Sequence, residues 1–487
     1  MDGKKAPGEG YESKNNTKMI SKYFLLLVLF FASFKSYSQS EIDITWNGAI
    51  DVIGTKIGLS VKFVTTSGIT SATMDIPEQG AKGIELNKVS FKNPKVHFEL
   101  PSSNGIAVFE GLYYGDSIGG TFMQGGIAGR FSLAKGELKP DQNVIDLTAL
   151  PYNADEVTFY NDANTFSGTL TYPKTGEKFP AVVMITGSGA QNRDEEIFGF
   201  KIFGIIADHL TKNGIAVLRY DDRGVGKSKG KTVSESTTED FAGDVGAAVD
   251  FLKTRTEIDA GKIGLFGHSE GGIVGPLTAS KRNDIAFLVL MAGTGVKGID
   301  IIKEQSKLIM KSENAADDDI AGYVMIIDMI YETLKKEGNI NELEGQLEQN
   351  VKDSYEKMSA EEKKAIKDKD AWVKETVNST IAQFNNKWMK FFLSYDPAPA
   401  LTKIKAPVLV LFGEKDLQVP PKQNQKFIED ALKNGGNNDF TVKIFPNANH
   451  LFQEAGTGSP NEYAQLPKQF VPGFLETVSD WILQKVK

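Results

Sequence analysis

The chain has 487 residues, of which 40% are hydrophobic and 24% are charged, an ordinary globular composition. At about 150 residues per domain, this length indicates about three structural units. The sequence has no cysteine, which excludes disulfides, thiolate nucleophiles and metal sites ligated by cysteine. Without residues 1–38, the chain has 49 basic and 60 acidic residues, a net charge of −11. Such an acidic protein is not expected to bind nucleic acid.

Residues 1–38 have the pattern of a leader and secretory signal peptide. Lysines precede a short apolar run over 23–34, and small residues at 36–38 provide a cleavage site. A charged residue ends the run before it reaches the ~20 residues that a transmembrane helix needs. Because the segment before Met19 is unusually polar, either Met1 or Met19 is the biological start. We therefore expect an exported protein, periplasmic or secreted, with no stable membrane anchor.

Residues 39–147 are predicted to form an N-terminal β domain, either a sandwich or a small barrel. Apolar and polar residues alternate over 57–63 and again over 96–100, which is typical of half-buried strands. Turn sequences recur at short spacing between these segments, as an antiparallel arrangement requires.

Residues 148–487 follow a different pattern, in which continuous apolar runs alternate with helical periodicity. Continuous apolar runs predict strands that are buried on both faces, as in a parallel sheet covered by helices. The alternation stops between about 297 and 395, where helical spacing and many charges predict a helical cap inserted in this domain. The predicted strands cover 181–185, 216–218, 263–266, 287–291, 408–412 and 440–445, and the predicted helices include 201–213, 239–255 and 473–486.

The strongest functional signal is a G-x-S-x-G sequence at 267–271. It directly follows the predicted strand 263–266 and precedes helical periodicity over 272–280, which is the strand-turn-helix context of a nucleophile elbow. The serine of such an elbow sits on a strained turn, and side chains two residues away would collide with the neighbouring strand and helix. Ser269 is therefore the candidate nucleophile.

A serine hydroxyl needs a base within hydrogen-bond reach and an acid that orients the base. With an elbow of this kind, the chain order is serine, acid, histidine, and His450 is the only histidine after Ser269. His268 adjoins the serine, but its side chain is expected to point away from the elbow. The acid is expected after the strand 408–412, where we favour Asp416 and keep Glu414 as the alternative.

Acyl transfer also requires two N–H donors that bind the oxyanion, each worth ~2.7–4 kcal/mol in the transition state. The first is the backbone N–H of Glu270, the residue after the nucleophile. The second is expected in the loop after the strand 181–185, and we assign it to the backbone of Ser188, with Gly189 as the alternative.

No cofactor and no metal are expected. The chain has only four histidines and no pair at metal-ligand spacing, which argues against a zinc hydrolase. The run Gly226-Lys227-Ser228 lacks the first glycine of a phosphate-binding loop, which would fall at position 221. A G-x-G-x-x-G sequence at 293–298 is a weak dinucleotide signal late in the sheet, where a glycine-rich exit loop is the simpler interpretation.

These motifs resemble the bacterial carboxylesterase branch of the α/β-hydrolase superfamily, which is close to serine aminopeptidase-like and dienelactone hydrolase-like proteins. The resemblance covers roughly residues 157–487 and depends on the elbow and on the segments 187–195, 221–228, 449–453 and 456–463. It implies an α/β-hydrolase fold, a mostly parallel eight-stranded sheet flanked by helices and carrying a cap. It also implies hydrolysis of carboxylic esters through an acyl-serine intermediate, without a cofactor.

The predicted function is therefore hydrolysis of a small-molecule carboxylic ester by an exported serine hydrolase. The alternative is a serine aminopeptidase or another amidase with the same triad, since a capped pocket also suits a peptide terminus. A hypothesis of a different class concerns the β domain over 39–147, which would act as a module that binds glycan or lipid.

Overall fold

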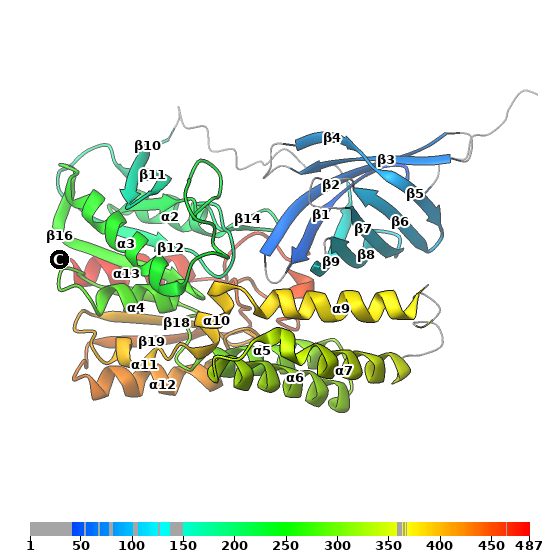
Figure 1. The fold of residues 1–487 in the computed structure, drawn as a ribbon. Helices are drawn as coiled ribbons and strands as arrows, with labels where there is room; N and C mark the ends of the chain where they lie inside the picture. The colour runs from blue at the N-terminus through cyan, green and yellow to red at the C-terminus, as the bar shows by residue number, and fades with distance from the viewer. Residues whose placement is uncertain are drawn as a thin grey trace, which may run out of the picture.

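The structure is a computed structural model of the 487-residue chain and describes residues 41–487 apart from short gaps. The gaps are 53–54, 67–68, 77–80, 101–105, 125–126, 137–149, 358–362, 364–365, 367 and 464. The predicted signal peptide and the predicted domain boundary at 147–148 therefore lie outside the described residues. Figure 1 shows a β domain beside an α/β domain, with a layer of inserted helices.

The β domain is one curled antiparallel sheet with the strand order β4-β3-β2-β1-β9-β8-β7-β6-β5 (Figure 1). Strands β3 and β5, near opposite ends of this order, contact each other, so the sheet nearly closes into a barrel. Of the two forms that the sequence allows, a sandwich or a small barrel, this single curled sheet agrees with the barrel. The strands are β1 (Thr45–Val52), β2 (Thr55–Thr66), β3 (Ile69–Ile76), β4 (Ala81–Glu85), β5 (Asn87–Lys92), β6 (Lys95–Leu100), β7 (Ala107–Tyr113), β8 (Ser117–Gln124) and β9 (Ile127–Lys135).

Aromatic side chains fill the interior of this barrel. Phe98 and Phe109 stack with their ring centroids 4.5 Å apart, and Phe131 meets both rings edge to face. Trp46 is fully buried, and its indole N–H donates to the carbonyl oxygen of Ile42 at 3.0 Å. The alternating apolar residues of the strands thus form a core of their own, as the period-two pattern predicts.

The second sheet has the order β10-β11-β15-β12-β16-β17-β18-β19. Strands β10 and β11 run antiparallel at one edge, and the six strands from β15 to β19 are mutually parallel. The strands are β10 (Tyr152–Asn161), β11 (Asn164–Pro173), β12 (Phe179–Ile185), β15 (Ala216–Tyr220), β16 (Ile258–His268), β17 (Leu288–Met291), β18 (Val408–Gly413) and β19 (Phe440–Phe445). This mixed, mostly parallel sheet confirms the predicted fold class.

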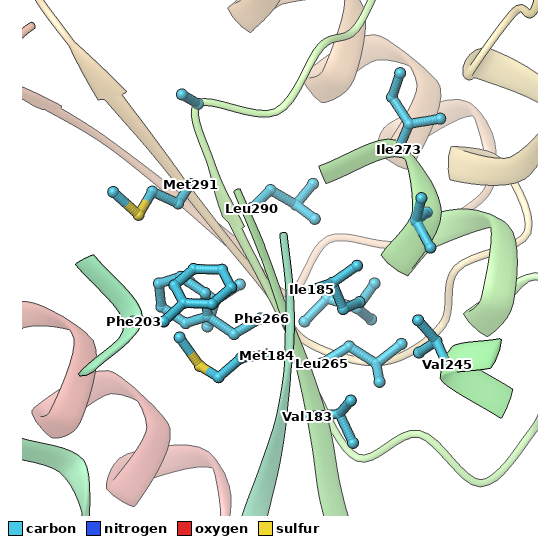
Figure 2. Close-up of a cluster of buried hydrophobic side chains, with 14 of the residues drawn as sticks. Val183, Met184, Ile185, Phe203, Val245, Leu265, Phe266, Ile273, Leu290 and Met291 are labelled. Carbon is cyan, nitrogen blue, oxygen red and sulfur yellow. The ribbon is translucent and has the colours of Figure 1, made fainter. Parts of the chain in front are cut away.

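Helices cover both faces of this sheet, which explains the continuous apolar runs of its strands. Helices α3 (Thr238–Lys253) and α4 (Gly271–Ala279) lie on one face, and α2 (Ile202–Lys212) and α13 (Phe474–Lys485) on the other. Figure 2 shows how neighbouring residues of one strand point to opposite faces. There, Met184, Phe203, Phe266 and Met291 lie on one side, and Val183, Ile185, Val245, Leu265 and Ile273 on the other. The remaining elements of this domain are the helices α11 (Ala398–Leu401) and α12 (Pro421–Asn434) and three short elements, β13 (Glu196–Ile197), β14 (Phe200–Lys201) and η3 (Pro460–Glu462).

The inserted helices lie between β17 and β18, begin at Gly298 and end at Ser394, where the sequence predicts a cap over about 297–395. The two ends of the insertion meet: Gly298 N–H donates to Tyr395 O at 3.2 Å, and an added Cβ at Gly298 would lie 1.9 Å from Phe392 O. The helices are α5 (Gly298–Ser312), α6 (Asp317–Lys335), η2 (Ile340–Leu343), α7 (Glu344–Lys357), α9 (Lys369–Phe384) and α10 (Lys387–Ser394).

The β domain contacts this layer of helices. Helix α9 packs along β9 (Figure 1), and Arg130 of β9 forms a 3.1 Å ion pair with Glu313 at the end of α5. Glu313 also accepts a hydrogen bond from Asn461 of the α/β domain at 2.6 Å, so this carboxylate joins all three parts. Among the described helices, none is both long enough and apolar enough to cross a lipid bilayer.

Candidate active site

The predicted nucleophile lies at the end of β16, on the turn into α4. Ser269 has φ = +53°, a left-handed conformation that costs a non-glycine residue energy and persists only where the surroundings impose it. Its N–H donates to the carbonyl oxygen of Met291 on the neighbouring strand at 2.9 Å, and its own carbonyl oxygen accepts from Gly272 N–H at 2.9 Å. These contacts hold the strained turn in place.

The glycines around Ser269 are required by close backbone approaches. An added Cβ at Gly267 would lie 2.0 Å from the carbonyl oxygen of Gly271, and one at Gly271 would lie 2.1 Å from that of Ile185. One at Gly272 would lie 2.5 Å from the Cα of Gly293. The elbow therefore packs directly against the ends of β12 and β17.

The predicted base and acid form a buried pair at the ends of two further strands. His450 follows β19, Asp416 follows β18, and His450 Nδ1 lies 2.8 Å from Asp416 Oδ2. The second oxygen of Asp416 accepts the backbone N–H groups of Gln418 and Val419, both at 2.8 Å, which fixes the carboxylate. Glu414 instead accepts the backbone N–H of Asn447 at 3.0 Å, so Asp416 is the acid that the structure brings to His450.

The loop after β12 passes against the nucleophile. An added Cβ at Gly187 would lie 3.2 Å from Ser269 Cβ, so the loop that carries the predicted donor Ser188 lies next to the turn that carries Ser269 and the other predicted donor, Glu270. The hydroxyl of Ser188 also donates to the carboxyl group of Glu270. Gly189, the alternative donor, has φ = +94°, a conformation that glycine adopts without strain.

The side chain of Glu270 joins the elbow to the cap. Its carboxyl oxygens accept the indole N–H of Trp388 on α10 at 2.9 and 3.0 Å and the hydroxyl of Thr238 on α3 at 2.8 Å. Burial raises the pKa of Glu270, and the hydrogen bonds from Trp388, Thr238 and Ser188 only partly offset that rise. Glu270, the residue after the predicted nucleophile, thus connects the cap to the elbow.

A pocket lies beside this acid. Burial raises the pKa of Asp222, which also lines the pocket, well above its usual value, although Thr186 and Gln191 donate hydrogen bonds to it. The charges of Glu195 and Glu270 raise that pKa further. The pocket is lined by Phe166, Ile185, Thr186, Gly187, Gly189, Tyr220, Asp222, Arg223, Val233, Phe241, Asp244, Glu270 and Val274.

Two residues of the site were not identified as functional from the sequence. Glu195 accepts the N–H of Gly187 at 2.7 Å and contacts His268 Nδ1 at 2.9 Å, and His268 Nε2 lies 3.1 Å from the carbonyl oxygen of His450. The ring centroid of His268 lies 4.8 Å from that of His450, so this side chain reaches the candidate base, a contact that the sequence did not predict. The only sequence signal for Glu195 was its place in the segment 187–195, on which the family resemblance depends. No spacing rule relates a residue in the loop after one strand to a residue at the end of another strand.

The other histidines lie elsewhere. His97 contacts Glu110 in the β domain at 2.8 Å, and His209 on α2 contacts Ser479 on α13 at 3.0 Å. Among the described residues, no group of three or more histidine, aspartate and glutamate side chains is placed to hold a metal ion.

Comparison with known proteins matches most of the α/β domain to a known family. A family model described as "Serine aminopeptidase, S33" matches residues 200–454, which is 255 of the 487 residues. The chain is similar to esterase EstD of Thermotoga maritima, with 26% identity over 301 residues, 62% of this chain and 61% of that relative. The chain thus spans less than two thirds of the relative's length.

Solved structures of two esterases are similar to part of this chain. An esterase of Pyrococcus furiosus, Pf2001, matches 70% of this chain and 94% of its own with a TM-score of 0.41 and 15% identity. Est1E of Butyrivibrio proteoclasticus, solved with ferulic acid bound, matches 68% of this chain and 99% of its own with a TM-score of 0.39 and 18% identity.

Proposed function

Because the chain belongs to the serine aminopeptidase S33 family of α/β hydrolases, we propose that it is an exported serine hydrolase that cleaves carboxylic esters. Ser269 is the nucleophile, His450 the general base and Asp416 the residue that orients the base. The backbone N–H groups of Ser188 and Glu270 bind the oxyanion. The substrate is a small-molecule ester, and no cofactor takes part.

The contact between His450 Nδ1 and Asp416 is the observation that carries this proposal. In the proposed mechanism, the other ring nitrogen, Nε2, takes the proton of Ser269 while Oγ attacks the acyl carbon. His450 then donates that proton to the departing alcohol, which leaves an acyl-serine. A water molecule, deprotonated by the same nitrogen, attacks the acyl carbon. His450 then returns this proton to Ser269 Oγ as the bond to the acyl group breaks, and the acid product leaves.

The pocket favours a neutral ester over a peptide terminus. An aminopeptidase needs an ionised carboxylate for the α-ammonium group of its substrate. Three carboxyl groups line the pocket, those of Glu270, Asp222 and Asp244. Burial raises the pKa of all three and thus disfavours their charged forms, and Asp244 already forms an ion pair with Arg223. The similarity to esterase EstD supports the same substrate class. An aminopeptidase with the same triad is the second candidate, and the description of the matching family favours it.

The test compares two substrate series with one enzyme. We would measure kcat/KM for p-nitrophenyl esters of increasing acyl length and for aminoacyl p-nitroanilides, with Ser269→Ala as the control for both. Rapid ester turnover, inert anilides and a loss of at least about 10⁴-fold in Ser269→Ala are expected. Full ester turnover by Ser269→Ala would refute the proposed nucleophile, and rapid anilide cleavage would establish the peptidase instead.

Export and a binding role for the β domain complete the proposal. The leader over 1–38 supports export to the periplasm or the medium. The β domain has its own core, separate from that of the catalytic domain, which suits a module that binds glycan or lipid. Cosedimentation of the full-length mature chain with insoluble glycans and with lipid vesicles tests this role, and failure to sediment with either would favour a purely structural domain.

A further inference from the structure

A second histidine and a second acid lie behind the catalytic pair. The side chains of His268 and Glu195 are 2% and 1% exposed, and the mechanism above uses neither of them. Glu195 lies in the segment between β12 and β13, and His268 is the last residue of β16. Their contact therefore connects two of the segments that surround the nucleophile.

Each contact of the pair reaches a part of the site that must be placed accurately. Glu195 Oε1 accepts the N–H of Gly187, the neighbour of the predicted oxyanion donor Ser188. His268 Nε2 lies 3.1 Å from the carbonyl oxygen of His450, the predicted base. These contacts thus connect the oxyanion loop with the base, in the order Gly187, Glu195, His268 and His450. His268 also directly precedes Ser269 in the sequence.

The partners of the imidazole determine how many protons the pair holds. One ring nitrogen of His268 faces a carboxylate oxygen and the other faces a carbonyl oxygen. A carbonyl oxygen only accepts, so Nε2 must carry a hydrogen, and the contact between Nδ1 and Glu195 needs another hydrogen on the nitrogen or on the carboxyl group. If the pair loses one of these protons, one of its two contacts is lost.

We propose that His268 and Glu195 form a positioning pair that holds the base His450 and the oxyanion loop in place around Ser269. The pair does so only while it holds two protons, one on His268 Nε2 and one between His268 Nδ1 and Glu195. The proposal rests on the proposed function, because it assigns a role toward Ser269 and His450.

The electrostatics of the site agree with this role. Burial lowers the pKa of His268, but the charge and hydrogen bond of Glu195, the carbonyl oxygen of His450 and the charge of Asp416 together raise it more. The groups that face the pair are Asp416 after β18, the ring of His450 after β19 and Asp222 after β15. The second oxygen of Glu195 is buried and has no hydrogen-bond partner among the described residues, which destabilises the folded state.

The experiment measures activity against pH in the full mature chain. Hydrolysis of a p-nitrophenyl ester and the rate of Ser269 labelling by a fluorophosphonate are followed from pH 5.5 to 9.5. The variants are Glu195→Gln, which keeps the size of the side chain, and His268→Gln. The matched control is His209→Gln, because His209 is a histidine of the same domain that is hydrogen-bonded to Ser479 away from the site.

The wild type is expected to lose kcat at alkaline pH as the pair loses a proton. In Glu195→Gln this loss should move about 1–3 pH units lower, because the charge that holds the proton is removed. His268→Gln should lower kcat about 10–100-fold with KM within about threefold and without this alkaline loss, because misplaced catalytic groups slow the chemical step. His209→Gln should match the wild type in both measurements.

Any one of three results would overturn the proposal. They are an unchanged alkaline profile in Glu195→Gln, a wild type that keeps its kcat up to pH 9.5, and a His268→Gln variant with the kcat of the wild type. Thermal unfolding of each variant shows whether it folds, and if His268→Gln does not, the profile of Glu195→Gln still decides. A wild type that is neither labelled at Ser269 nor active on esters refutes the proposed function, and the positioning role with it. A labelled, active wild type with unchanged variants refutes the positioning pair alone.

Discussion

His450 Nδ1 lies 2.8 Å from Asp416 Oδ2, and the two side chains are 5% and 0% exposed. Replacing Asp416 by Asn keeps the shape of the side chain but allows the imidazole to adopt the wrong tautomer, so kcat should fall about 10⁴-fold. Glu414→Gln should change kcat less than about threefold, because Glu414 contacts the backbone of Asn447 and not the base. Burst kinetics with a p-nitrophenyl ester measure both variants, and equal losses would show that the acid is misassigned.

The elbow should not tolerate a methyl group at Gly271. Gly271→Ala would place Cβ 2.1 Å from the carbonyl oxygen of Ile185, and the shift that relieves this contact should cost about 1–3 kcal/mol and most of the activity. Gly275→Ala, one turn further along α4, is the matched control. Its Cβ would lie 3.6 Å from Ile185 Cδ1, an ordinary contact, and the helix should gain about 0.5–1 kcal/mol. Urea unfolding and ester turnover of the two variants check this contrast, and equal behaviour would contradict it.

The ion pair between Arg223 and Asp244 should contribute strongly to stability. Their side chains are 5% and 3% exposed, and Arg223 donates to both carboxylate oxygens, at 2.5 and 2.8 Å. Arg223→Ala leaves a buried carboxylate without its cation and should lower the free energy of unfolding by about 3–5 kcal/mol. The loss should shrink at acid pH, because burial raises the pKa of Asp244 and the acid then takes up a proton.

A surface pair provides the comparison for Arg223. Lys426 and Asp430 are 80% and 48% exposed, so Lys426→Ala should change the free energy of unfolding by less than about 0.5 kcal/mol. Urea titrations at pH 7 and pH 5 measure both variants. A loss of less than about 1 kcal/mol in Arg223→Ala would contradict the buried-pair argument.

Asp222 and Asp284 should affect the pH dependence of stability with opposite signs. The folded-state pKa of Asp222 is raised above 3.8, so the folded state binds more protons and stability falls as the pH rises from about 4 toward that pKa. Asp222→Asn removes this fall, and its amide can still donate to the Thr186 hydroxyl and accept from Gln191 N–H. The variant should therefore gain stability relative to the wild type as the pH rises.

Asp284 is the control with the reverse sign. Hydrogen bonds from Arg282 and Lys253 lower the pKa of Asp284, so its contribution is present above 3.8 and is lost as the pH falls. Asp284→Asn should destabilise the protein at pH 7 and approach the wild type near pH 2. Thermal unfolding from pH 2 to 8 follows both variants, and parallel curves for all three proteins would refute both assignments.

The fold could be predicted largely from local patterns. Continuous apolar runs require a sheet covered on both faces, and the strands 181–185 and 408–412 appear in the structure as β12 and β18. The alternation in the β domain required a half-buried antiparallel sheet, although a sandwich and a barrel share that pattern. Closure depends on how β3 and β5 approach each other, and these strands are not paired by any local turn.

The site was predictable only in part. The glycines at 267 and 271 identify the elbow because backbone contacts exclude a side chain there, and the scarcity of histidines points to His450. The choice between Asp416 and Glu414 could not be argued as firmly, since both follow the same strand. It depends on which carboxylate the loop after β19 approaches.

The sequence by itself determined the layers of the fold, the elbow and the order of the candidate triad, because these follow from hydrophobic periodicity and from the space that a Cβ occupies. The tertiary structure decided which acid meets His450, that Trp388 of the cap binds Glu270, and that His268 connects Glu195 with the His450 loop. The contacts of His268 join residues 73 and 182 positions apart. Such contacts depend on where separate loops meet at the ends of the strands. Local sequence periodicity does not determine which loops come together there.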